Sequence, residues 1–153
     1  MKKTKKRKTK GVRSAIYSRV SLSEKEKLNN HKQQDRCIDY GFENGLTENG
    51  ADIFEDTASG MTNADEREGL SALLINARTG RFKHVIVYKY DRLARNVREL
   101  LTILETLKSL GITVHSATEP IPADTVSGKF LLTMLMATTE YEMLIKRERN
   151  HNK

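Results

Sequence analysis

Short apolar runs alternate along the chain with segments whose apolar residues recur at helical spacing. Four runs have the length of a strand and cover residues 12–20, 51–54, 85–88 and 112–114. Four segments with helical periodicity lie between or after them, at residues 29–44, 70–77, 97–107 and 128–150. The last segment contains no helix breaker, so it predicts a helix roughly 33 Å long, at about 1.5 Å per residue.

This order of elements predicts an α/β fold. Strands that alternate with helices form right-handed βαβ units. We therefore expect a three-layer sandwich, in which a mostly parallel central sheet has helices on both faces and a long C-terminal helix follows. A chain of 153 residues has the size of one such domain. The expected boundaries are a basic disordered tail at residues 1–11, a folded domain at residues 12–127 and the long helix at residues 128–150.

The net charge of +7 comes from the N-terminal tail. The first ten residues hold seven lysines and arginines and no acid, which leaves 20 cations and 20 anions in the remaining chain. Such a block fits either a nonspecific phosphate-binding arm or a solubilising tail. Cys37 is the single cysteine and cannot form an internal disulfide. No stretch approaches the roughly 20 apolar residues of a membrane span, so we expect a soluble protein of a reducing cytoplasm, without membrane contact.

Charged and hydroxyl side chains follow the predicted strands at one edge of the sheet. In parallel sheets of this kind the functional groups lie in loops beyond the carboxyl ends of the strands. Those positions hold four arginines and a serine: Arg19, Ser21, Arg67, Arg92 and Arg95. If the turn that carries Arg92 and Arg95 is helical, both side chains can face one point, where a bound anion would offset their conflict with the helix dipole.

These side chains suit an attack on a phosphodiester. A serine hydroxyl serves as nucleophile once a neighbour activates it, and guanidinium groups stabilise the charge on the phosphoryl oxygens without losing their protons. Structural alternatives stay open. Arg92 and Arg95 could form a solvated face with salt bridges to Glu99, and Asp56 and Ser59 could only cap or turn their loop.

Other classes of chemistry lack their sequence signatures. The chain has no GxxxxGK[ST] or GxGxxG motif for nucleotides and no Gly-x-Ser-x-Gly elbow of an ester hydrolase. Its four histidines are widely spaced and match no metal-ligand pattern. We therefore expect neither a metal nor another cofactor, and a metal-dependent nuclease is the least favoured alternative.

An ordered set of motifs extends over most of the chain. In chain order the motifs are Tyr17-Ser18-Arg19-Val20-Ser21, Asp56-x-x-Ser59-Gly60, Arg67, Asp91-Arg92-Leu93-x-Arg95 and the long helix that begins at Gly128. With these motifs the chain resembles the serine recombinases, in particular the N-terminal catalytic domain of resolvases and invertases. Gln33 followed by Cys37 fits the spacing of the larger members of that family.

The resemblance implies a mechanism and a set of roles. Ser21 would attack a DNA phosphate, form a 5′-phosphoserine link and release a 3′-hydroxyl, without ATP or a metal. The other implied catalytic residues are Arg19, Arg67, Arg92, Arg95 and Asp91. The implied supporting residues are Tyr17, Gln33, Asp56 and Ser59. The implied DNA contacts are Lys25, Lys89, Lys129, Lys146 and Arg147. The partners would be double-stranded DNA and further copies of the chain, as homodimers that pair into a tetramer through the helix at 128–150.

Three positions depart from the family pattern. Lys25 replaces a frequent glutamine, Glu68 replaces a frequent proline and Met143 replaces a usual arginine. Family members also carry a C-terminal DNA-binding domain, which we expect to be absent from this chain. The chain would then be a catalytic-domain fragment or a shortened member. The alternative function is that of a non-catalytic DNA-binding or assembly partner of a full-length recombinase.

Overall fold

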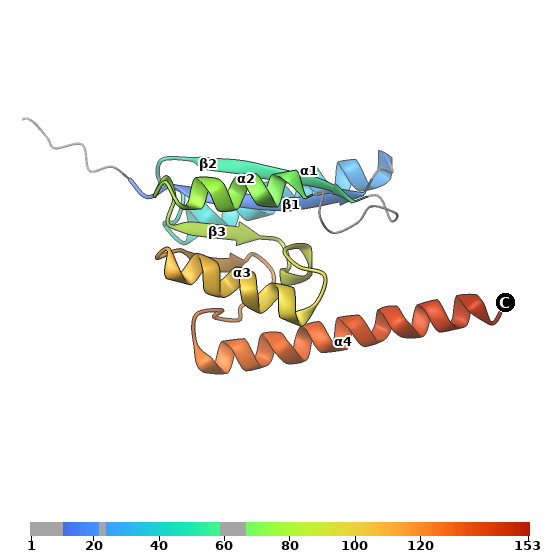
Figure 1. Cartoon of the computed structure of the whole chain (residues 1–153). Coiled ribbons are helices and arrows are strands. Elements are labelled where there is room, and N and C mark those ends of the chain that lie inside the picture. The colour runs from blue at the N-terminus through green and yellow to red at the C-terminus, as the bar shows by residue number, and fades with distance from the viewer. Residues whose placement is uncertain (1–10, 22–23, 59–66) are drawn as a thin grey trace, which may run out of the picture.

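The computed structural model describes residues 11–21, 24–58 and 67–153. Of residues 21, 24–27 and 58 it describes the backbone only. In chain order the elements are β1 (Ser14–Ser21), α1 (Glu24–Glu43), β2 (Ala51–Ala58), α2 (Glu68–Ala77), β3 (His84–Val87), the 3-10 helix η2 (Tyr90–Arg92), α3 (Val97–Ser109), β4 (Thr113–Ser116) and α4 (Val126–His151) (Figure 1). Strands and helices alternate as the hydrophobic pattern predicts.

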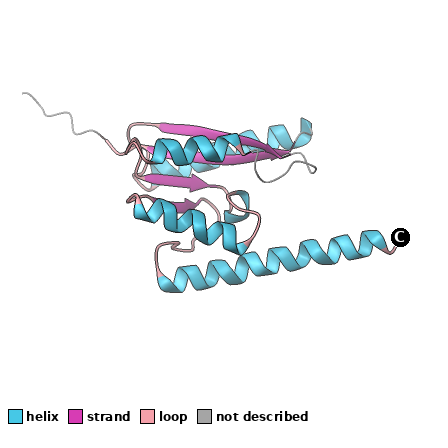
Figure 2. Ribbon diagram, in the orientation of Figure 1, coloured by secondary structure: helices cyan, strands magenta, loops and turns pink. Residues whose placement is uncertain are grey.

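The described strands form one parallel sheet in the order β2-β1-β3-β4. Helix α1 covers one face, and α2 and α3 cover the other (Figure 2). Side chains alternate between two core clusters: Ile16 and Ile86 pack with Cys37 of α1, whereas Tyr17 and Val87 pack on the side of α2 and α3. The expected three-layer α/β sandwich is confirmed.

Strand β2 is longer than the apolar run that predicts it. The sequence predicts a strand at 51–54 and a loop from residue 55, but β2 continues to Ala58. The polar residues there are held by neighbouring helices. The Glu55 carboxylate accepts hydrogen bonds from Gln34 (2.7 Å) and Asn30 (3.1 Å) of α1, and Asp56 is buried against α2. Helix α1 likewise begins at Glu24, earlier than the predicted residue 29.

Helix α4 begins beside α3 and extends past it (Figure 1). The hydroxyl of Thr125 caps its first turn by accepting a hydrogen bond from the backbone N–H of Gly128 at 2.9 Å. Leu132 and Met136 bury one side of the helix in the core. Further along, the Glu140 carboxylate accepts a hydrogen bond of 2.8 Å from the backbone N–H of Val97, the first residue of α3. The long C-terminal helix predicted from the sequence is therefore present.

None of the helices in the described ranges combines the length and the apolar character that a membrane span requires.

We predict that Gly128→Ala destabilises the domain. A Cβ atom at position 128 would lie 1.6 Å from the carbonyl oxygen of Pro122, so α4 would have to move away from the preceding loop. Overpacking of this kind costs about 1–3 kcal/mol, and the change should appear as a lower midpoint of urea unfolding. Ser127→Ala, at the exposed neighbouring position, is the control. Equal midpoints for the two variants would contradict the close approach of α4 to this loop.

Candidate active site

The site lies where the strand order reverses. Strand β2 lies on one side of β1, while β3 and β4 lie on the other, so the carboxyl ends of β1 and β3 form the crevice where open α/β sheets bind ligands. Arg19 lies near the end of β1, and Asp91 to Arg95 follow β3 directly. Ser21 is the last residue of β1 and is in register with Ala58 of β2. Its side chain lies outside the described part of the structure.

Arg67 joins three elements at this edge. It is the N-cap residue of α2 and is only 8% exposed. Its Nη2 donates hydrogen bonds to the Tyr17 hydroxyl of β1 at 2.8 Å and to the carbonyl oxygen of Leu93 at 2.6 Å. Its Nη1 donates to the Glu99 carboxylate of α3 at 2.8 Å. The guanidinium group also lies over the Tyr17 ring, 5.5 Å from the ring centroid.

Tyr17 and Asp56 continue this network toward α2. The Tyr17 hydroxyl donates a 2.7 Å hydrogen bond to Asp56, whose carboxylate also accepts from the backbone N–H groups of Gly69 (2.7 Å) and Leu70 (2.9 Å). Burial raises the pKa of Tyr17 well above its usual value, so the phenol keeps the proton that it donates. Asp56 therefore has the capping function that the sequence left open, and it also holds Tyr17 toward Arg67.

Three arginines act on the guanidinium group of Arg19 at this edge. Arg19 is half-buried, and burial lowers its pKa. The positive charges of Arg67, Arg95 and Arg92 lower that pKa further, so all four arginines lie within electrostatic reach. The structure thus brings together the four arginines that the sequence places in separate loops. A polyanion bound among them would relieve their mutual repulsion.

The segment that carries Arg92 and Arg95 is less helical than the sequence suggests. Only a single 3-10 turn forms at residues 90–92, and Arg95 lies between this turn and α3. Arg92 Nε lies 3.8 Å from the Asp91 carboxylate, which makes a loose ion pair. The two arginines therefore do not share an α-helical turn, although both act on the pKa of Arg19.

Asn96 and Glu99 form a modified capping pair at the N-terminus of α3. The Asn96 side chain accepts the 2.8 Å hydrogen bond from the Glu99 backbone N–H, as the capping motif predicts. The Glu99 carboxylate, however, accepts from the backbone N–H of Arg95 at 2.9 Å and pairs with Arg67. The sequence suggests Glu99 as a surface partner of Arg92 and Arg95, but no local motif links it to Arg67, which is 32 residues away.

The sequence pattern does not identify Gln34, whose side-chain amide is buried on α1. Gln33, the predicted supporting residue, is half-buried, whereas the adjacent Gln34 is 7% exposed. Gln34 Nε2 donates hydrogen bonds to Ser18 of β1 at 2.8 Å and to Glu55 of β2 at 2.7 Å. Asn30, Gln34 and Cys37 are buried at helical spacing, which is the signal that could have identified Gln34. A hydrophobic pattern does not register this spacing, because two of the three side chains are polar.

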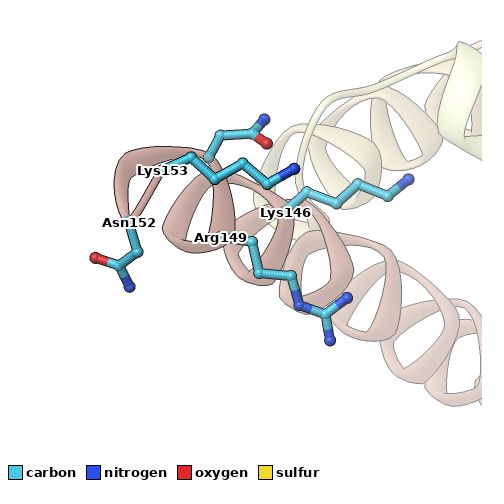
Figure 3. A pocket seen from close by; sticks show the side chains of 5 residues that line it. Lys146, Arg149, Asn152 and Lys153 are labelled. Carbon is cyan, nitrogen blue, oxygen red and sulfur yellow. The ribbon is translucent and has the colours of Figure 1, made fainter.

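The predicted DNA contacts are scattered over the surface. Lys89 is exposed immediately before η2, and Lys129 is half-buried in the first turn of α4. Lys146 and Arg147 are exposed on the part of α4 that extends past α3 (Figure 1). Figure 3 shows Lys146 beside further basic and amide side chains that line a shallow pocket there: Arg149, Asn150, Asn152 and Lys153. Ser59 and the side chain of Lys25 lie outside the described residues.

No group of three or more histidine, cysteine or acidic side chains that could hold a metal ion occurs within the described ranges.

Comparison with known proteins matches this arrangement to one family. The model of the resolvase N-terminal domain matches residues 14–153. The chain belongs to the serine recombinases of the resolvase family. It is 33% identical over 136 residues to the transposon Tn552 resolvase of Staphylococcus aureus, a match that covers 88% of this chain and 61% of that protein. It is 36% identical over 99 residues to a DNA-invertase of Enterobacteria phage P7, which covers 63% of this chain and 51% of that protein.

A solved relative has the same arrangement of elements. The N-terminal catalytic domain of TP901-1 integrase aligns with a TM-score of 0.62 and 29% identity, covering 87% of this chain and 98% of that chain. By contrast, this resolvase-family chain spans only about three fifths of the length of the first curated relative. The aligned part of this chain therefore has about the same extent as the catalytic domain of TP901-1 integrase.

We predict that Tyr17→Phe destabilises this resolvase domain. The change removes the hydroxyl that donates to Asp56 and accepts from Arg67, and it leaves buried polar atoms without that partner. The expected loss is about 1–3 kcal/mol of unfolding free energy, measured by urea denaturation. Tyr141→Phe is the matched control, because Tyr141 is 64% exposed on α4. If both variants unfold at the same urea concentration, the buried hydroxyl contributes nothing to stability.

Proposed function

We propose that the chain is the catalytic domain of a serine site-specific DNA recombinase in which Ser21 is the nucleophile. The observation that carries the proposal is the convergence of Arg19, Arg67, Arg92 and Arg95 at the edge of the sheet where β1 ends. Side chains alternate along a strand, so Tyr17 and Arg19 belong to the same face of β1, the face toward which Arg67 is held. A hydroxyl at the end of this strand would meet a phosphate bound by the arginines.

The proposed reaction exchanges one phosphodiester for another. The Ser21 hydroxyl gives up its proton as its oxygen attacks phosphorus, the bond from phosphorus to the 3′-oxygen breaks, and the 3′-oxygen takes up one proton as it leaves. The product is a 5′-phosphoserine link, and attack of a 3′-hydroxyl on that link restores the DNA and the free serine. The number of phosphoester bonds is conserved, so rejoining requires no ATP. The guanidinium groups stabilise the charge that develops on the phosphoryl oxygens.

The residues around the arginines are proposed to orient them. Tyr17 and Asp56 hold Arg67 from the side of β1 and α2, and Asp91 lies close to Arg92. We infer that DNA phosphates extend from this site along further basic residues, with contacts from Lys25, Lys89, Lys129, Lys146 and Arg147. Gln33 and Ser59 stay in this proposal as supporting residues.

A second copy of the chain is the proposed partner of α4. Leu132 and Met136 bury one side of this helix, but another side carries exposed apolar residues at helical spacing. Val126, Phe130, Met134, Tyr141 and Leu144 form this apolar stripe, and each is at least 56% exposed. A stripe of this length on a helix that extends past the domain favours helix–helix packing between copies, as in a dimer that pairs into a tetramer.

The nucleophile can be tested with a pool of random-sequence duplexes. The protein is incubated with the pool. Covalent adducts with DNA, which survive denaturation of the protein but are removed by protease, are then captured and the DNA is sequenced. The wild type should form such adducts, and Ser21→Ala should abolish them without changing the midpoint of urea unfolding. Ser71→Ala, an exposed serine on α2, should react like the wild type. Adducts formed by Ser21→Ala would disprove the assignment, and a wild type that binds DNA without adducts would indicate a non-catalytic binding partner.

The apolar stripe can be tested by sedimentation. We predict that Phe130→Glu and Met134→Glu shift the protein from dimer to monomer in analytical ultracentrifugation, because each places a charge in the proposed contact. Asn150→Glu adds the same charge at an exposed position on another side of α4 and should leave the dimer intact. Identical sedimentation of all three variants would exclude the stripe as the contact between copies.

A further inference from the structure

The Glu99 carboxylate lies between two arginines of the proposed site, in the first turn of α3. One of its oxygens accepts a 2.8 Å hydrogen bond from Arg67 Nη1, and the other accepts a 2.9 Å hydrogen bond from the backbone N–H of Arg95. Its own backbone N–H donates to the Asn96 side chain at 2.8 Å, which fixes the position of the residue. A single side chain therefore joins the start of α2 to the segment between β3 and α3.

The contact with Arg67 is electrostatically important because Arg67 is buried. The Arg67 side chain is 7% exposed and that of Glu99 is 28% exposed. The other partners of the guanidinium group are the neutral Tyr17 hydroxyl and the carbonyl oxygen of Leu93. Within the described residues, Glu99 is the carboxylate paired with this charge. A buried guanidinium group depends on such a partner, because loss of one member of the pair leaves an uncompensated charge.

We propose that Glu99 is a positioning residue that directs Arg67 and the Arg95 segment toward the scissile phosphate. The proposal rests on the proposed recombinase function. Both Glu99 oxygens are occupied by protein donors, so the residue acts through the arginines and not on the phosphate.

A purely structural role for Glu99 makes a different prediction. Glutamate in the first turn of a helix often serves only as a cap, and the bond to the Arg95 backbone would be sufficient for that. Glu99→Gln separates the two roles. The amide oxygen can still accept from Arg95, but the NH₂ group would then face Arg67, a donor facing a donor. Glu105→Gln, an exposed change of the same type on the same helix, is the control.

The first measurement follows the arginines by NMR in the uniformly ¹⁵N-labelled protein. Glu99→Gln should broaden or shift the Arg67 guanidinium signals, while Glu105→Gln should leave them unchanged. Protection of the Arg95 amide against hydrogen exchange reports the capping bond separately. Unchanged Arg67 signals in Glu99→Gln would overturn the proposal, whether or not the Arg95 amide changes. This measurement uses no DNA and therefore does not depend on the proposed function.

The second measurement separates DNA binding from the covalent step, with a duplex recovered from the random pool as the probe. Glu99→Gln should slow single-turnover adduct formation about tenfold or more, because misdirected groups lose catalytic rate, while its affinity for the duplex stays equal or rises with the added positive charge. In an Arg67→Lys background the same change should have little further effect. The proposal that Glu99 acts through Arg67 would be refuted by an unchanged rate of adduct formation in Glu99→Gln. It would also be refuted if the rate losses of Glu99→Gln and Arg67→Lys multiplied in the double variant. If the wild type forms no adduct, the proposed function fails and the NMR result alone decides the role of Glu99.

Discussion

The buried charge of Arg67 is the constraint around which the edge of this domain is organised. A guanidinium group with so little solvent exposure must replace its lost hydration with protein acceptors. It finds them on three elements: the Tyr17 hydroxyl on β1, the carbonyl oxygen of Leu93 after β3 and the Glu99 carboxylate on α3. Because each acceptor comes from a different part of the chain, satisfying this one charge fixes how α2, β1 and α3 lie relative to one another.

The same requirement explains why like charges can gather here. The neighbouring arginines lower the pKa of Arg19, and an uncompensated cluster of like charges would oppose folding. Asp56 and Glu99 lie on the protein side of the cluster and are bound to fixed donors. The carboxylates therefore offset part of the positive charge from the protein side of the cluster. That arrangement suits the binding of a phosphate, whose charge completes the compensation.

The parts of the fold that apolar periodicity specifies were predictable from the sequence. The strand that ends at Val87 and the long helix α4 follow such patterns, and so does the sheet edge at which Arg19 and Arg92 meet. The features that the sequence did not predict share one physical cause. Glu55, Asp56 and Gln34 are polar residues in positions that a hydrophobic pattern assigns to loop or surface, and they are accommodated there through hydrogen bonds between elements. Such partners are distant in sequence, so no local pattern identifies them.

The N-terminus of α3 shows how this long-range pairing links the site to the long helix. Its backbone N–H groups and those just before it are bound by the side chains of Asn96, Glu99 and, from α4, Glu140. The positive end of the helix dipole stabilises both carboxylates there. The Glu99 carboxylate also pairs with Arg67, and Glu140 belongs to α4, the helix that carries the exposed apolar stripe. A displacement of α4 along α3 must therefore move or break the bond to Val97, two residues after Arg95. The packing of α4 and the placement of the arginines thus depend on the same few backbone groups.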